Sequence, residues 1–460
     1  MKHLIYVFII IMLVIGTNSG ISHSKVTAEE AKQLGLEGTP LTPMGSERAG
    51  NADGRIPAWT GGVTKLPDGY KKGDYHPFPF KEDAKLFTIT KDNIDQYKAN
   101  LTDGQIALFK AYPDTFKMNV YPTHRTASFP GYVYEAFLRN AVTAELVEGG
   151  NGFIGASISS PFPIPKNGIE AIWNHVCHFR GTMVGKYGAQ AAPTRTGDYV
   201  IMKMVESLMV PYSNKDIDIN TLEKENIFGK FLQIITSPAR LAGTALLIHE
   251  HLNQVKDPRK AWTYNTGQRR VRRAPNVAYD YPGTASDGLR TTDDWDMFNG
   301  APDRYNWELK GKKEIYIAYN CYNLHSEKLK YDDILKAGHI NQDHVRYELH
   351  RVWVIEANLK EGIRHLYKKR VFYLDEDSWQ AQIAEMYDAR DELWRVAILH
   401  AINYYEVPSL WSTMEIFHDL QAGRYLATGL DNEEKKMYDF DIVLSDKNFT
   451  SGALRRTGVR

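Results

Sequence analysis

Residues 346–403 decide the fold, and they read RYELHRVWVIEANLKEGIRHLYKKRVFYLDEDSWQAQIAEMYDARDELWRVAILHAIN. Between 347 and 356 the odd positions (YLRWI) share one face of an extended chain and the even positions (EHVVE) share the other. Both faces mix apolar and polar groups, as in a curved sheet with one lined interior. Turn signals such as Glu-Gly interrupt the pattern, which predicts strands at 346–359, 367–375, 379–388 and 391–403.

The period of two extends back to about residue 180, and helical periodicity precedes it. Further strands are expected at 199–211, 228–237, 241–252, 261–273 and 305–320, and helices at 92–112, at 131–147 and from Asn167. Strands that follow one another without helices are connected antiparallel. The sequence therefore predicts an α+β, mainly β protein: a large curved antiparallel sheet or incomplete β-barrel, with helices packed in its concave side.

The composition excludes several classes of protein. The 460 residues are 43% hydrophobic, with 56 basic and 56 acidic residues, so neither a disordered chain nor a nucleic-acid binder is expected. The 27 Tyr, 18 Phe and 9 Trp residues favour strands and apolar binding surfaces. Cys177 and Cys321 are too few for a disulfide scaffold. They form either one disulfide or two buried free thiols, and we prefer the thiols because neither lies in a recognisable spacing.

The first residues are typical of an export signal. A positive start (Met1-Lys2-His3) precedes an apolar run from Leu4 to Gly16, and Ser22 and Ser24 give a small-x-small cleavage pattern. An uncleaved anchor is the alternative, although the run is shorter than the roughly 20 residues of a spanning helix. We therefore expect an exported, periplasmic protein. Its predicted divisions are a signal peptide (1–24), a Gly/Pro-rich extension wrapping the body (25–90), a curved-sheet domain (91–432) and a C-terminal tail (433–460).

The search for catalytic motifs identifies no nucleophile, metal or cofactor site, so neither a catalytic residue nor a cofactor is predicted. His249-Glu250-His251 lacks the spacing of a metallopeptidase, and neither a phosphate loop nor a dinucleotide fingerprint is present. Acidic groups at 293–296 and 375–377 could serve a glycosidase, which needs two carboxyls facing a groove. The alternative is that they are solvated turn formers.

The most basic stretch is Gln268–Arg273, in which Arg270 and Arg272 alternate with Arg269, Val271 and Arg273. This segment could hold an anionic head group or a partner. The alternative is a set of exposed strand arginines paired to the acidic turn at 293–296.

Several blocks resemble a known family. The stretch PMGSERAGNADGRIPAWTGG (43–62) looks like the opening signature of a bacterial exported family, "domain of unknown function 1329". PFPIPKNG (161–168) continuing to His175, and RVFYLDEDSW (370–379), resemble the same family. The segment from Trp262 to Arg273, with Asp293-Asp294 and Phe298–Gly300, is similar to outer-membrane lipoprotein-sorting factors.

The resemblance implies a LolA/LolB-like fold with an apolar cavity for acyl chains. It further implies a periplasmic carrier or accessory protein for a lipid or other hydrophobic compound, associated with the outer membrane. An outer-membrane β-barrel protein and an inner-membrane efflux-type transporter are the implied partners. An envelope lipid- or glycan-acting enzyme, or a structural adaptor for the β-barrel partner, are the alternatives. The expected cavity or head-group residues are Trp262, Tyr264, Arg270, Arg272, Trp353 and Tyr373.

Overall fold

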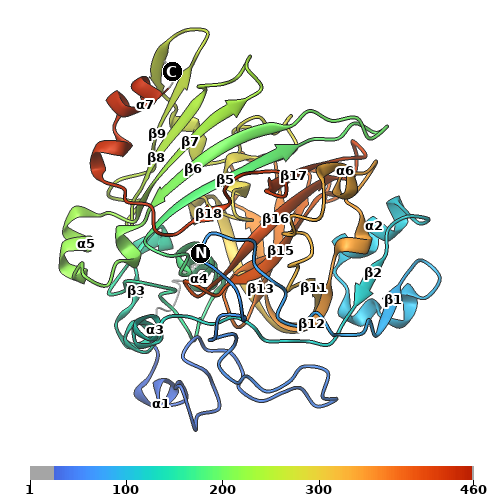
Figure 1. Ribbon diagram of the computed structural model, residues 1–460. Coiled ribbons are helices and arrows are strands. Elements are labelled where there is room, and N and C mark those ends of the chain that lie inside the picture. Colours follow the sequence, from blue (N-terminus) through green and yellow to red (C-terminus); the bar gives the residue numbers. More distant parts are fainter. Residues whose placement is uncertain (1–24, 458–460) are drawn as a thin grey trace, which may run out of the picture.

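The protein is built around one large open sheet, seen in Figure 1. The computed structural model describes residues 25–457, so the expected signal peptide lies outside the described residues. β11 (Tyr305–Ala318) pairs with β12 (Tyr347–Leu359), and the sheet continues antiparallel from β12. The order is then β13 (Lys369–Asp375), β14 (Ala381–Tyr387), β15 (Leu393–Tyr404), β16 (Ser409–Asp419), β17 (Arg424–Leu430), β5 (Met183–Ala191), β6 (Met202–Met209), β7 (Gly229–Ser237), β8 (Ala245–Glu250), β9 (Lys260–Asn265) and β10 (Arg270–Arg273).

Short strands complete the sheet without closing it. β2 (Met118–Val120) pairs with β1 (Phe87–Ile89) and meets β12 in parallel through Val120 and Tyr347. β18 (Tyr438–Asp439) pairs with β5, and β3 (Glu145–Leu146) pairs with β4 (Phe153–Ile154) apart from the sheet. Within residues 25–457, β10 and β11 do not pair with each other. The predicted mainly β class with a large, incomplete antiparallel sheet is therefore confirmed.

The helices are short, and one of them lies wholly inside the protein. All ten residues of α4 (Gly168–Cys177) are buried, and α4 contacts β11 and β12. The Asn167 side chain caps it by accepting a hydrogen bond from the Glu170 amide. A Cβ on Gly168 would lie 2.7 Å from the Glu308 nitrogen, so only glycine lets the helix approach β11 this closely. The other helices are α1 (Ala28–Ala31), α2 (Asp103–Ala111), α3 (Gly131–Thr143), α5 (Ile219–Glu225), α6 (Tyr331–Ile334) and α7 (Ser451–Thr457).

Two expected elements are divided in the structure. The expected helix at 92–112 is two 3₁₀ turns followed by α2, because a capping box formed by Thr102 and Gln105 starts a new helix there. The expected strand at 261–273 is the hairpin β9–β10, in which Arg269 adopts a positive φ of 51°. The strands β5, β16 and β17 were not among the sequence predictions.

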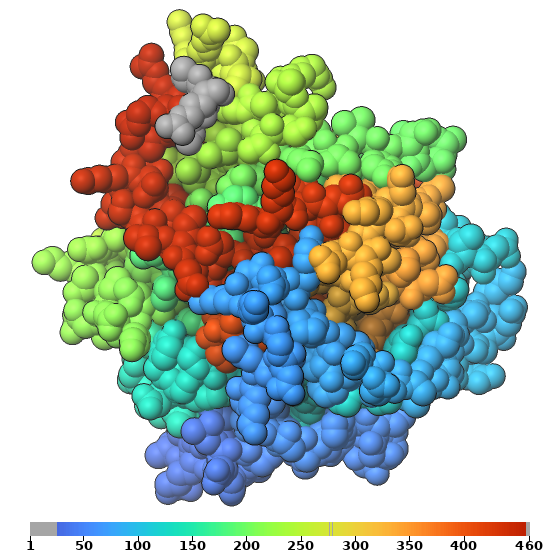
Figure 2. All heavy atoms as spheres, in the orientation of Figure 1, coloured from blue at the N-terminus to red at the C-terminus, as the bar shows by residue number. Residues whose placement is uncertain are grey.

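Residues 36–83 form an ordered coil without helix or strand, and they pack against the body. Met44 and Trp59 are buried in the same apolar cluster as α3 and α4. In Figure 2 this blue segment covers the lower part of the face shown, below the red C-terminal residues. The positions of the domain boundaries stay predictions.

The strands β6 to β9 have two faces that pack against different parts of the chain. Leu208, Phe231 and Ile248 lie opposite one another on what we call the inner face. Leu232 and Leu247 point to the other, outer face, where they cluster with Leu454 of α7 and with Leu444 and Phe449. The C-terminal segment therefore covers the outer face and leaves the inner face to form a cavity.

Candidate functional site

The acidic turn at 293–296 is buried and is held by arginines from distant parts of the chain. Arg370 donates to Asp293 Oδ2 at 2.9 Å and to Asp294 Oδ1 at 2.5 Å, and Arg180 binds Asp296. The alternative that the β10 arginines pair with this turn is wrong. Arg270, Arg272 and Arg273 are exposed, whereas buried carboxylates need cations that are buried beside them.

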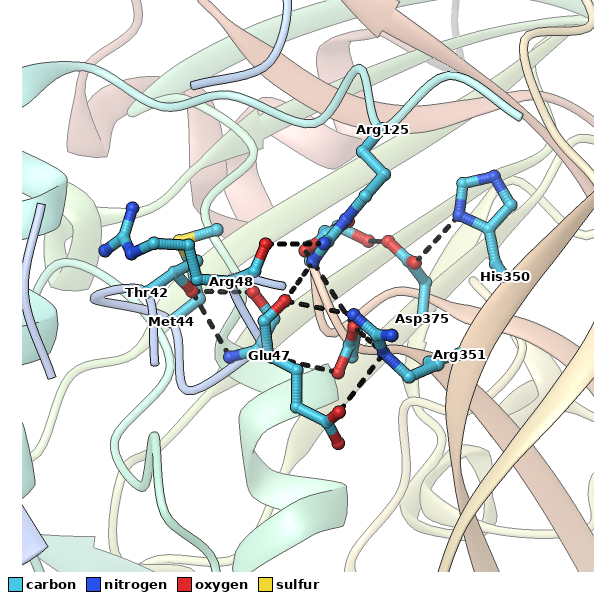
Figure 3. A network of polar contacts seen from close by, with 12 residues as sticks. Thr42, Met44, Glu47, Arg48, Arg125, His350, Arg351 and Asp375 are labelled. Carbon is cyan, nitrogen blue, oxygen red and sulfur yellow. Dashed lines mark hydrogen bonds and ion pairs between the residues drawn. The ribbon is translucent and has the colours of Figure 1, made fainter. Parts of the chain in front are cut away.

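The second acidic group, residues 375–377, anchors the N-terminal coil, as Figure 3 shows. Arg125 donates to both carboxylate oxygens of Asp377, at 2.7 and 2.6 Å, and to the main-chain carbonyl of Glu47 at 2.8 Å. Arg351 donates to Glu376 Oε1 at 2.7 Å and to the carbonyl of Ala49 at 2.6 Å. These forked contacts join the signature segment 43–62 to the turn after β13. The structure therefore gives the acids at 375–377 a clear architectural role.

Asp375 is the acid in this group that forms no ion pair with an arginine. Its Oδ2 accepts a hydrogen bond from the Ser378 hydroxyl at 2.5 Å, and its Oδ1 lies 3.7 Å from Nδ1 of His350. Burial and the neighbouring Asp377 raise the pKa of Asp375 to about 7. His350, Asp375 and Asp377 could each offer one metal ligand, with the ligand atoms within 4.8 Å of one another. Arg125 already binds both oxygens of Asp377, so this donor set does not fit a metal ion.

A cavity lies on the inner face of β6, β7 and β8. Its empty space, with the open solvent at its mouth included, is about 880 Å³. One wall is the sheet, and the opposite walls are the chain after α4 and residues 283–299. The apolar side chains that line it are Val176, Leu208, Val210, Phe228, Phe231, Leu246, Ile248 and Trp295.

Polar groups at the cavity wall are mostly paired with each other. Arg259 forms a salt bridge with Glu250 at 2.7 Å, and Arg180 pairs with Asp296. Burial, with the neighbouring charge of Arg180, lowers the pKa of His178 well below its usual range, so this imidazole is neutral at physiological pH. Arg290 is different: it is 6% exposed, and its Nε has no hydrogen-bond partner. The cavity is thus mainly apolar, with one arginine that has no ion pair among the described residues.

The sequence-predicted residues from 262 to 272 lie away from this cavity. Trp262 and Tyr264 pair across the sheet with Leu247 and Ala245, so strand alternation turns them to the outer face. Arg270 and Arg272 are exposed on the edge strand β10. Ligand contacts by these four residues stay predictions for a different surface.

The other two predicted residues pack within the main core. Trp353 stacks on Trp379 with ring centroids 5.9 Å apart, and Tyr373 is buried and donates to Glu385 at 3.4 Å. Neither lines the cavity, and their contact with a ligand also stays a prediction. Sequence reasoning missed Phe231 and Ile248, although both stand in strands that it predicted. Alternation groups such residues on one face, but it does not say which face encloses a cavity.

Comparisons with known proteins place the chain in a family. Residues 88–455 match the family model described as "Protein of unknown function (DUF1329)". The chain belongs to this family. The uncharacterized protein PA3922 of Pseudomonas aeruginosa is 54% identical over 435 residues, which cover 95% of this chain and 94% of that protein.

Solved structures are similar to this DUF1329 chain at low sequence identity. A DUF1329 family protein from Desulfovibrio piger is 15% identical with a TM-score of 0.41, covering 60% of this chain and 92% of that one. A LolA superfamily protein from Nitrosomonas europaea is 14% identical with a TM-score of 0.34, covering 59% and 92%. Both scores are below 0.5, so the architecture rests on the strand pairing described above. In the described part of this DUF1329 protein, no helix combines the length and apolar character needed to cross a membrane.

Proposed function

We propose that this protein is a periplasmic carrier or accessory protein that binds a lipid or another hydrophobic compound for envelope transport. The cavity on the inner face is the observation that supports the proposal. A cross-strand row of apolar side chains, formed by Leu208, Phe231 and Ile248, makes its floor, and Trp295 lies on the opposite wall. Each CH₂ group that enters such a site gains about 0.8 kcal/mol, so binding requires no catalytic group.

The enzyme alternative has less support. Of its candidate carboxylates at 293–296 and 375–377, all but Asp375 form salt bridges with buried arginines or a lysine. Asp375 is 0% exposed and does not line the cavity, whereas a glycosidase needs two carboxyls facing a groove. A carboxylate in a buried arginine pair is stabilised in its charged form and already has its hydrogen-bond donors. Such an acid has little capacity to protonate a leaving group. We therefore favour binding over catalysis.

The proposal also includes a cellular location and partner proteins. The export-like leader predicts passage into the periplasm. There, a carrier with a shielded apolar site would connect the proposed inner-membrane transporter with the proposed outer-membrane β-barrel protein. The adaptor alternative would use the coil at 36–83 as its contact surface. An adaptor, unlike a carrier, needs no ligand in the cavity.

Ligand extraction tests the proposal directly. We would purify the chain without its leader, measure its native mass, and extract bound compounds with organic solvent. We expect a copurifying apolar compound, and displacement of it by N-phenyl-1-naphthylamine with a rise in fluorescence. Ile248→Trp fills the cavity from its floor and should lower dye binding at least about tenfold. Val200→Trp, at a position that is 65% exposed, is the matched control and should bind as the wild type does.

The results separate the carrier from its alternatives. If neither a copurifying compound nor dye binding is found in folded protein, the carrier proposal is wrong. If Ile248→Trp binds the dye as well as Val200→Trp does, the hydrophobic site lies elsewhere. Circular dichroism of both variants verifies that they are folded.

A further inference from the structure

Arg290 stands between two neighbouring spaces. It lines the apolar cavity and also a smaller chamber of about 400 Å³. Trp295 lines both spaces as well. The smaller chamber differs from the cavity in its charged side chains, which besides Arg290 are Lys186, Glu206 and Glu415. The two spaces together thus offer an apolar region on one side of Arg290 and a region with further charged side chains on the other.

Arg290 is buried but forms no direct ion pair, and Glu415 is the acid that its charge acts on from a greater distance. Its guanidinium carbon lies 5.7 Å from the ring centroid of Phe417, and it forms no salt bridge in the described part of the chain. Arg180, Arg259 and Lys230, the other basic side chains at the cavity wall, each have a carboxylate partner. An unpaired buried charge is costly, so such a group is expected where a ligand supplies the opposite charge.

Other unpartnered polar atoms lie around the same space. Nε of Arg180, Nε2 of His178 and Oε1 of Gln233 are buried without hydrogen-bond partners, and all three residues line the apolar cavity. Most buried polar groups in proteins are hydrogen-bonded. Three such unpartnered polar atoms at one wall therefore indicate that the ligand has a polar group and is not a hydrocarbon alone.

Glu206 and Glu415 repel an anion in the smaller chamber only weakly. Glu206 already accepts a hydrogen bond from the Gln233 amide at 2.7 Å. Burial and the nearby Asp296 raise the pKa of Glu415 to about 7 against the opposing effects of Lys186 and Arg290. Glu415 is therefore partly neutral near pH 7, and less negative charge opposes an anion beside Lys186 and Arg290.

We propose that the ligand is an amphiphile with a single anionic head group, a carboxylate or a phosphate, which Arg290 binds while the apolar part occupies the cavity. This proposal rests on the proposed carrier function and specifies its ligand class. A guanidinium donates two parallel hydrogen bonds to either oxyanion, which gives both attraction and orientation. The head group would lie between the two spaces, and the acyl chain or ring system would extend along Phe231 and Ile248.

Matched competitors test the proposal in the whole mature chain. Hexadecanoic acid, hexadecyl phosphate and 1-hexadecanol would each compete with bound N-phenyl-1-naphthylamine. The three share one apolar chain, so differences between them report on the head group. We expect an acid or the phosphate to bind about tenfold or more tightly than the alcohol, since a hydrogen bond to a charged group contributes this much. The preferred oxyanion distinguishes a carboxylate ligand from a phosphate ligand.

Three variants locate the effect. Arg290→Met should reduce the binding of the anionic competitor to the level of the alcohol and leave the alcohol unchanged. Arg240→Met, at an exposed position that lines neither space, is the matched control and should retain the preference. Arg290→Lys should keep part of it.

The results distinguish a failure of this inference from a failure of the proposed carrier function. If all three compounds bind equally, or Arg290→Met keeps the preference for the anion, the inference is overturned while the carrier function stands. If none of them displaces the dye and the dye itself does not bind, the carrier function fails. Arg290→Met removes a buried charge that has no salt bridge, so the variant should stay folded, which circular dichroism verifies; a loss of folding would also contradict the assignment.

Discussion

Arg370 is the residue whose replacement tests the framework of the cavity most directly. Its side chain is 0% exposed and is packed among Phe298, Tyr367 and Phe372. It bridges Asp293 and Asp294 of the loop that supplies one wall of the cavity. Methionine has a similar shape without the charge, so Arg370→Met isolates the loss of the ion pairs.

The expected cost follows from the two carboxylates that would remain. Burial by itself would raise the pKa of Asp293. The charge of Arg370 and the hydrogen bond from His365 have a larger effect in the opposite direction and hold this pKa below its usual range. Removing one partner of a buried ion pair costs about 3–5 kcal/mol, because the other charge stays buried and uncompensated. We therefore expect Arg370→Met to lower the free energy of unfolding by about 3–5 kcal/mol near pH 7.

Urea unfolding followed by circular dichroism measures this loss. The exposed Arg270→Met is the matched control and should stay within about 0.5 kcal/mol of the wild type. Adding Asp293→Asn and Asp294→Asn to Arg370→Met should recover much of the loss, because the amides leave no buried charge. A loss below about 1 kcal/mol, or a triple variant as unstable as the single one, would refute the reasoning.

Three further predictions concern other parts of the chain. Asp375→Asn should become more stable relative to the wild type as the pH rises from about 4 to 7, because a raised folded pKa stabilises only below that pKa; parallel urea titrations measure the difference. Gly45→Ala should destabilise the N-terminal coil by about 1–3 kcal/mol, since Gly45 has a φ of +87° and a Cβ there would lie 1.8 Å from the Pro163 carbonyl oxygen; faster proteolysis within 36–83 is the readout. Cys177 and Cys321 are both buried free thiols, as we preferred, and burial raises the pKa of Cys321 to about 12; a thiol reagent should label neither before unfolding.

The sheet could be predicted from the sequence because its signal is local. Alternation along 346–359 or 391–403 depends only on neighbouring residues, and β12 and β15 are found there. The same signal failed at 261–273, where a turn reverses the chain while the alternation continues on both sides. Asn265, Thr266 and Gly267 are turn residues that could have marked the break.

The buried networks could not be predicted in this way. Arg125 and Asp377 are 252 residues apart, and Arg370 is separated from Asp293 by 77 residues. No periodicity links such pairs, and an isolated acid in a turn looks the same whether it is solvated or buried. The cavity could not be predicted from the sequence for a related reason. Its walls come from the strands β6 to β8, the chain after α4 and the loop around Trp295, which only the folded chain brings together.

The buried ion pairs and the cavity are linked by the loop they share. Empty apolar space destabilises a protein in proportion to its volume, so a cavity persists only if its walls cannot collapse. Here Arg370 fixes the loop from one side through Asp293 and Asp294, and Arg180 fixes it from the other through Asp296. These buried ion pairs hold the apolar wall in place and so keep the space open for a ligand. A bound ligand then stabilises the folded protein further. Weakening these ion pairs with Arg370→Met should therefore weaken ligand binding as well as folding, a coupling that the exposed Arg240→Met should not show.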